Sequence, residues 1–146
     1  MTRHLVAGRF DSGDQTTIEK ATDEQATLLP FGPAEDLAFG IGHALDDLAR
    51  LGIYPSEIGV DLLILAAHVH AADTRISRVS ESQDGWTREI RLVVPVSDPS
   101  TWLATQRTLK RALNFLTGDR WQIGFRSRPP THGVIAAVPP EQRSTC

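Results

Sequence analysis

The clearest pattern of hydrophobic and polar positions lies in the second half of the chain. Alternate positions from Trp86 to Val96 are mostly apolar and those between them mostly polar, which predicts a half-buried strand. Asp98 followed by Pro99 predicts a helix start, because the carboxylate accepts an orphan N–H and the proline needs none. Gly118 suits the end of that helix, and a second alternating strand follows it. We therefore predict a strand, a helix and a second strand in this region.

The helix of this region carries one apolar stripe. Its members recur at three- and four-residue spacing and are Trp102, Leu109, Leu113 and Leu116. Side chains at this spacing share one face of a helix, so we expect all four to pack inward. Trp86 and Trp121 fall on the apolar sides of the two strands, and we expect both rings to lie in the core as well.

The first half of the chain predicts two more helices after one or two strands. Residues 4–10 and 26–30 have strand character, and a turn at residues 11–14 suggests an early β-hairpin. A stripe of Leu37, Ile41, Leu45 and Leu48 predicts the first helix, with Gly52 as its end. Ser56 is a predicted N-cap for the next helix, which has the widest apolar arc and should be the most buried.

These elements together predict an α+β fold. We expect an antiparallel or mixed sheet of about 4–5 strands. Three main helices, at about 34–51, 56–76 and 99–117, should pack on one face of it. A chain of 146 residues suits one core, so residues 1–128 are predicted to form a single domain. The proline-rich residues 129–146 are predicted to be a tail or linker.

Charge is divided unevenly along the chain. Residues 1–74 hold 4 Lys and Arg against 12 Asp and Glu, whereas residues 75–146 hold 11 against 6. The basic half is almost entirely arginine, a side chain suited to phosphate and carboxylate. Packing of the acidic half against the basic half, or plain solvation, is the favoured explanation. A surface for an acidic or nucleic-acid partner is the other.

Several classes of function are disfavoured by simple features of the sequence. The only cysteine is Cys146, so neither a disulfide within the chain nor a cysteine metal cluster is predicted. No apolar run reaches the length of a membrane span, and the first ten residues lack the pattern of a signal peptide. We therefore expect a cytoplasmic protein that does not engage a membrane.

No motif predicts a catalytic residue, a metal site or a cofactor. His68 and His70 diverge on a helix, so they are expected at its surface or boundary rather than on one metal ion. No nucleotide-binding or nucleophile motif occurs. The candidate binding surface is a basic patch near the last helix and strand, comprising Arg107, Lys110, Arg111, Arg120, Arg126 and Arg128.

Three segments carry a family resemblance. They are DLLILAAHVHAADTRISR, DGWTREIRLVVPVSDPSTW and LNFLTGDRWQIGF. Together they resemble the N-terminal accessory region of 7-cyano-7-deazaguanine synthase-like (QueC-like) proteins of bacterial anti-phage defence systems. The family's catalytic part carries a Ser-Gly-Gly-x-Asp-Ser loop and a zinc-binding cysteine cluster, and this chain has neither. No catalytic residue can therefore be transferred from the family.

The resemblance implies a non-catalytic accessory domain. Such a domain would dock on a synthase-like catalytic domain or on another protein of the same defence operon. The alternative from the residues themselves is a nucleic-acid-binding module that uses the arginine-rich C-terminal half. A small enzyme with an unrecognised acid and base is a third, less favoured, hypothesis.

Overall fold

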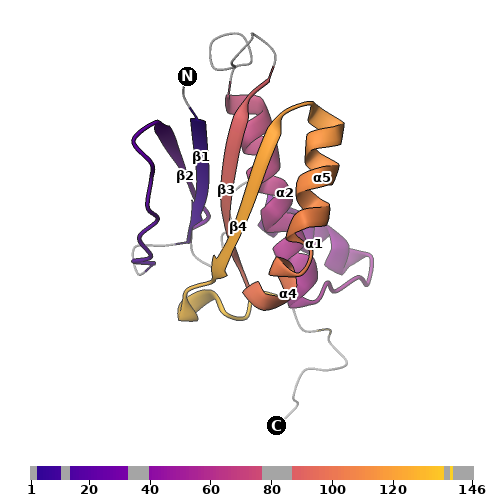
Figure 1. Ribbon diagram of the computed structural model, residues 1–146. Helices are drawn as coiled ribbons and strands as arrows, with labels where there is room; N and C mark the ends of the chain where they lie inside the picture. Colours follow the sequence, from indigo (N-terminus) through magenta and orange to yellow (C-terminus); the bar gives the residue numbers. More distant parts are fainter. Residues whose placement is uncertain (1–2, 11–13, 33–39, 77–86, 137–138, 140–146) are drawn as a thin grey trace.

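Parallel strands and helices on one face of them define the architecture (Figure 1). The structure, a computed structural model, describes residues 3–10, 14–32, 40–76, 87–136 and 139. The strands are β1 (Arg3–Arg9), β2 (Glu24–Pro30), β3 (Glu89–Val96) and β4 (Arg120–Ser127). The helices are α1 (Ile41–Arg50), α2 (Glu57–Arg75), α4 (Pro99–Leu103) and α5 (Gln106–Thr117), with a short 3₁₀ helix η2 (Pro130–His132).

The sheet has the order β2-β1-β3-β4, and every neighbouring pair is parallel. The prediction of an antiparallel or mixed sheet is therefore wrong. The early hairpin is wrong for the same reason, because β2 runs beside β1 in parallel register from Arg3 with Glu24 to Arg9 with Pro30. More than a dozen residues connect these two strands, which is enough chain for a parallel crossover without a helix.

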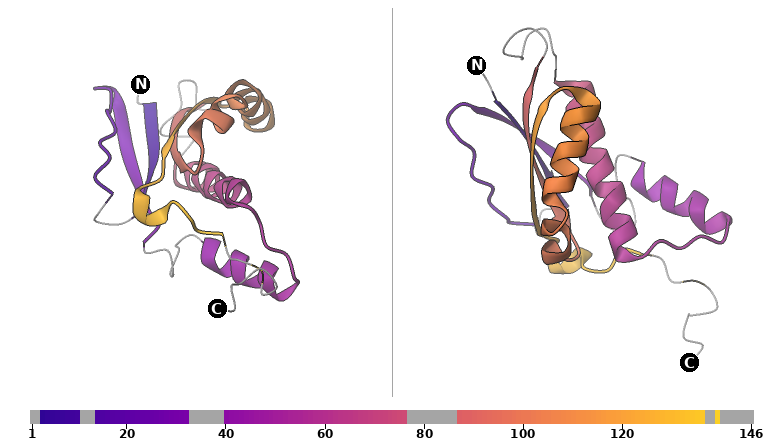
Figure 2. Two further views of the ribbon diagram at one scale, coloured as in Figure 1. Left: turned by 90° about the horizontal axis from the view of Figure 1, so that it is seen from below. Right: turned by 45° about the vertical axis from the view of Figure 1, so that its right-hand side comes forward.

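The helices cover one face of the sheet, and the connection between β1 and β2 crosses the other (Figure 2). Helix α2 packs on β3 and β1, α5 packs on β4, and α1 lies outside α2. We call the side without helices the open face. Two arginines hold the β1–β2 connection there: Arg91 donates to the carbonyl of Glu19 and Arg126 donates to the Asp14 carboxylate.

Helix ends follow their local signals closely. Ser56 caps α2 by accepting from the Gly59 N–H, and Asp98 caps α4 by accepting from the Ser100 N–H. The helix predicted over 99–117 is two helices, α4 and α5, separated at Thr105, whose hydroxyl donates to the Trp102 carbonyl. The helix predicted from residue 34 begins at residue 41, and the predicted residues 34–39 lie outside the described part.

The core lies between the helices and the inner face of the sheet. Trp121 and Trp102 are buried there as predicted, while Trp86 lies outside the described residues. Helix α2 supplies the largest share of buried helical side chains, also as predicted. His68 was expected at the surface or boundary, and this was wrong: it is fully buried against Phe31, because β1 approaches α2 closely at Gly8.

Residues after β4 fold back on the domain. In η2 the His132 ring is buried and stacks on Phe10, with ring centroids 4.5 Å apart. The Glu57 carboxylate accepts from the N–H groups of Ile135 and Ala136 at 2.7 and 2.6 Å. The first part of the predicted tail is thus held to the start of α2, and residues 140–146 lie outside the described part.

Candidate binding surfaces

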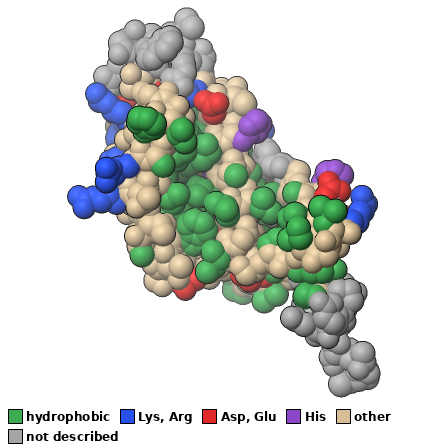
Figure 3. All heavy atoms as spheres, turned by 90° about the vertical axis from the view of Figure 1, so that its right-hand side faces the viewer, with side chains coloured by type: hydrophobic (Ala, Val, Ile, Leu, Met, Phe, Trp, Pro, Cys, Tyr) green, Lys and Arg blue, Asp and Glu red, His purple; other side chains and the backbone are tan. Residues whose placement is uncertain are grey.

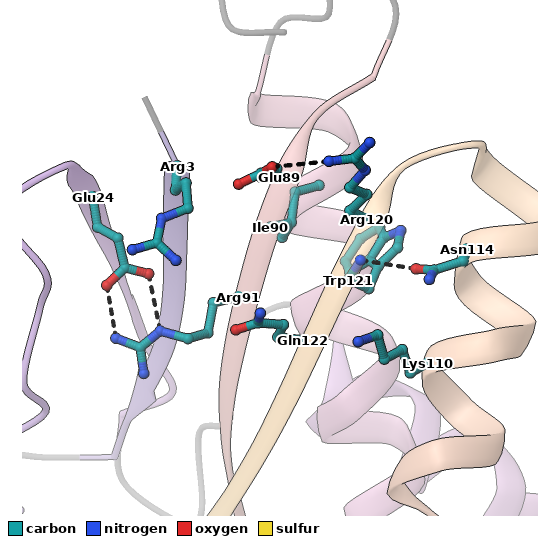
Figure 4. A pocket seen from close by; sticks show the side chains of 10 residues that line it. All are labelled: Arg3, Glu24, Glu89, Ile90, Arg91, Lys110, Asn114, Arg120, Trp121 and Gln122. Carbon is teal, nitrogen blue, oxygen red and sulfur yellow. Dashed lines mark hydrogen bonds and ion pairs between the residues drawn. The ribbon is translucent and has the colours of Figure 1, made fainter. Parts of the chain in front are cut away.

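A polar hollow lies on the open face, at the amino-terminal ends of the strands (Figure 4). It has a volume of about 440 Å³, and a second hollow of about 470 Å³ adjoins it and shares Arg91, Lys110 and Gln122. We call the two together the basic groove. Its polar lining comes from Arg3, Glu24, Glu89, Arg91, Gln106, Arg107, Lys110, Asn114, Arg120 and Gln122.

Strand alternation and parallel register together build the floor of the groove. Side chains two apart on a strand share a face, and neighbouring strands align Glu89 with Arg120 and Arg91 with Gln122. The same face of β1 carries Arg3, opposite Glu24 of β2. Charged residues from distant parts of the sequence therefore lie side by side on the open face.

Arginines of the floor are largely held by acidic partners. Arg91 donates from Nε and Nη2 to the two oxygens of Glu24, both at 2.9 Å. Arg3 makes a similar pair with Asp23 at 2.8 and 2.9 Å, and Arg120 lies 3.4 Å from Glu89. The hydrogen bond from Arg91 holds the pKa of the buried Glu24 below its ordinary value, so the pair is ionised at neutral pH.

Two cations from α5 stand at the rim without such a partner. Within the described residues, no ion pair or hydrogen bond engages the side chains of Arg107 or Lys110, and both residues are exposed. The Lys110 side chain extends from α5 toward Gln122 (Figure 4). These two side chains are the charges most available to a ligand.

Helix α5 is fixed against the edge of β4 by its own amides. The Asn114 side-chain oxygen accepts from the Trp121 N–H at 2.8 Å, and the Gln106 amide donates to the Ile123 carbonyl. Gln106, Lys110 and Asn114 are four residues apart and share one face of the helix. The bonds above and below Lys110 therefore hold its backbone at the rim of the groove.

The structure divides the six predicted candidate residues into three groups. Arg107, Lys110 and Arg120 line the basic groove, and Arg111 lies exposed on α5 without lining it. Arg126 is bound to the Gly8 carbonyl at 2.8 Å and to Asp14 at 2.6 Å. Arg128 is buried between Glu57 and Asp61. The last two arginines stabilise the fold and are remote from the groove lining.

Arg3, Arg91 and Gln122 complete the groove but were not among the predicted residues. The alternation of β3 and β4 already placed Arg91 and Gln122 on outward-facing positions. Their neighbourhood with Arg3 depends on the pairing of β1 with β3, which no local pattern reveals.

Asp61 is the most heavily bonded carboxylate in the described part of the chain. It is fully buried and accepts from the Ser97 N–H at 2.9 Å, the Ser97 hydroxyl at 2.6 Å and the Trp102 indole at 2.9 Å. The Arg128 guanidinium is its fourth partner. Since these donors fill its oxygens, Asp61 acts as a structural junction between α2, β3, α4 and the segment after β4.

The carboxyl ends of the strands, where parallel sheets usually bind ligands, are filled by the chain itself. Arg126 closes on the end of β1, and the stacked rings of Phe10 and His132 lie beside it. Within the described residues, no group of three or more metal-ligating side chains is placed to hold an ion. Among the same residues, no helix has the length and apolar character needed to cross a membrane.

An apolar surface lies on the helical side, between α5 and α2 (Figure 3). Its exposed members are Leu62 of α2, Leu103 of α4, and Phe115 and Leu116 of α5, and we call them the apolar face. Leu116 was predicted to face the core, and this was wrong: it is 75% exposed, while Leu109 and Leu113 are only partly buried. Helix α5 buries no side chain completely, since it lies beside β4 at the edge of the sheet.

Comparisons with protein-family models, with curated proteins and with solved structures find no match for this chain. The resemblance to QueC-like proteins therefore stays a prediction. The basic groove and the apolar face carry the functional argument that follows.

Proposed function

We propose that this chain is a cytoplasmic, non-catalytic accessory domain that docks on a partner protein through the apolar face. The observation that carries the proposal is the exposure of two adjacent large side chains on α5, Phe115 at 88% and Leu116 at 75%. Together with Leu62 and Leu103 they form a surface over three helices. Such surfaces on a folded chain are typical of protein interaction sites.

The energetics favour burial of these side chains by a partner. Complete burial of a leucine or phenylalanine contributes about 1.5–3 kcal/mol, so a few anchors can supply most of an interface's binding energy. The sequence pattern agrees with this role, because Leu116 continues an apolar stripe that the domain's own core does not use.

The proposed partner is a deazaguanine synthase-like catalytic domain, or another protein of the same anti-phage defence system. Support for this class comes from the family resemblance, whose three segments span residues 61–78, 84–102 and 113–125. In the fold, these segments contribute to α2, β3, α4, α5 and β4. They therefore supply the apolar face as well as the strands behind it.

Binding of the synthase-like protein encoded with this chain tests the proposal directly. Isothermal titration calorimetry should detect a complex, and Leu116→Ser should weaken it by about tenfold or more, since one buried leucine is lost. Leu28→Ser is the matched control, because Leu28 is a half-exposed leucine of β2 on the open face. Its affinity should equal that of the unmodified chain.

Two results would overturn the proposal. One is a complex whose affinity is the same for Leu116→Ser and Leu28→Ser, because the partner would then use another surface. The other is the lack of any complex while light scattering shows a dimer of this chain that Leu116→Ser dissociates, because the apolar face would then be a self-association surface.

A further inference from the structure

The basic groove holds more positive than negative charge. Five cationic side chains line it, against the two carboxylates of Glu24 and Glu89. We propose that the groove binds a phosphate-bearing ligand, either a nucleic-acid strand or a free nucleotide. This site is separate from the apolar face, since it lies on the open side of the sheet and the outer rim of α5.

The way in which the cations are held favours phosphate over carboxylate. A carboxylate is best recognised by the free planar fork of an arginine. The forks of Arg3 and Arg91 already engage Asp23 and Glu24. The unengaged Lys110 is a compact charge that serves phosphate well without demanding planar geometry.

An amide donor adds to the site. Because the Asn114 oxygen accepts from the Trp121 N–H, its two amide hydrogens point away from the strand edge. Asn114 lies one turn beyond Lys110, and both line the hollow of about 440 Å³. A phosphate near them would meet one full charge and one neutral donor.

The groove lacks an exposed ring on which a base could stack. Trp121 lines it, but the tryptophan is fully buried. Binding should therefore follow the phosphates and be almost independent of base sequence. The second hollow extends the groove along β4 past Gly124, which gives room for more than one phosphate of a strand.

Fluorescence anisotropy with a labelled single-stranded oligothymidylate tests the proposal on the full chain. Affinity should fall steeply between about 50 and 200 mM NaCl, because phosphate contacts release counterions. The double variant R107Q/K110Q should weaken binding by at least about tenfold at low salt and reduce the salt slope by roughly one. ATP and inorganic phosphate are the competitors that separate the two sources of phosphate.

Arg111→Gln is the matched control, since Arg111 is an exposed cation of the same helix that does not line the groove. Its affinity should stay within about twofold of the unmodified chain. Competition by ATP at concentrations comparable to the oligonucleotide would assign a nucleotide, and competition by the oligonucleotide alone would assign a strand.

Equal losses for Arg111→Gln and each groove variant would overturn the proposal, because binding would then be a diffuse effect of net charge. Failure to bind both the oligonucleotide and ATP would overturn it as well. Leu116→Ser should keep the oligonucleotide affinity unchanged, so failure of the docking proposal and failure of this one are distinguishable.

Discussion

At the scale of single residues, His68 is the most unusual titratable group. Burial lowers its pKa to about 4, with a smaller effect from the charge of Arg126 and an opposing hydrogen bond to the Ile64 carbonyl. Its Nε2 is buried without a hydrogen-bond partner, so the ring is neutral in the folded chain at physiological pH. The site is therefore a hidden acid sensitivity in the core.

This burial predicts acid destabilisation well above the range of carboxylates. Unfolded histidine binds a proton near pH 6.5, so stability is complete above that value and is lost as the pH falls toward about 4. The loss between pH 7 and 5 should be about 2 kcal/mol. Denaturant titrations should show it in the unmodified chain and in His43→Gln, an exposed control, and show less in His68→Leu. Equal losses in both variants would contradict the assignment to His68.

Gly8 is required by the same contact. A Cβ at this position would lie 2.7 Å from His68 Nε2 and 2.9 Å from a ring carbon of Phe31. We expect Gly8→Ala to cost about 1–3 kcal/mol of unfolding free energy through overpacking. The cost should shrink in the double variant Gly8→Ala/His68→Ala, and additive losses in thermal or denaturant unfolding would rule this explanation out.

At the scale of elements, α5 protects the edge of the sheet. The outer edge of β4 presents backbone groups that another strand could pair with, and Asn114 and Gln106 occupy two of them. Asn114→Ala should cost about 1–2 kcal/mol, because the Trp121 N–H loses its partner. Thr108→Ala is the control in denaturant unfolding, since Thr108 is exposed on the same helix and the gain in helix propensity is similar. Equal stabilities would show that the edge bond contributes nothing.

Elements differed in how far the sequence could predict them. Caps at Ser56 and Asp98 were predicted because each acts over two or three residues of chain. The parallel direction of β2 was missed, because it depends on pairing with β1 across a long connection that carries no decisive turn signal. The class α+β survived this error, since helix and strand periodicity do not depend on strand direction.

Site residues show the same limit. The basic patch was predicted from sequence proximity, which placed Arg107, Lys110 and Arg120 correctly near one another. It also included Arg126 and Arg128, whose acidic partners come from the first half of the chain. Only three-dimensional pairing distinguishes an arginine that stabilises the fold from one that is available to a ligand.

At the scale of the whole molecule, the acidic half and the basic half are matched through the fold. Ion pairs join Asp14 to Arg126 at 2.6 Å, Glu24 to Arg91 at 2.9 Å and Asp73 to Arg88 at 2.8 Å. Each pair joins a residue of the first 74 to one of the remainder. Uneven charge along the chain is thus largely internal neutralisation, and the cations of α5 are the part left over.

Glu24 shows how this matching should govern acid stability as a whole. The Arg91 hydrogen bond lowers the folded-state pKa of Glu24 from an ordinary value of 4.5, so its contribution is complete above about 4.5. That contribution is lost as the pH falls through the lowered pKa, where the folded chain must also take up the proton. Glu24→Gln should therefore cost about 1–3 kcal/mol at pH 7 and progressively less in strong acid. There the protonated Glu24 of the unmodified chain resembles glutamine.

Urea titrations of both chains from pH 7 to about pH 2.5 measure this convergence. Glu19→Gln is the control, because Glu19 lies exposed on the same connection and offers Arg91 only its backbone carbonyl. Its stability should follow the unmodified chain at every pH. A constant gap between Glu24→Gln and the unmodified chain would mean that the ionised pair adds nothing beyond packing. The matching of the two halves would then not be what acid disrupts.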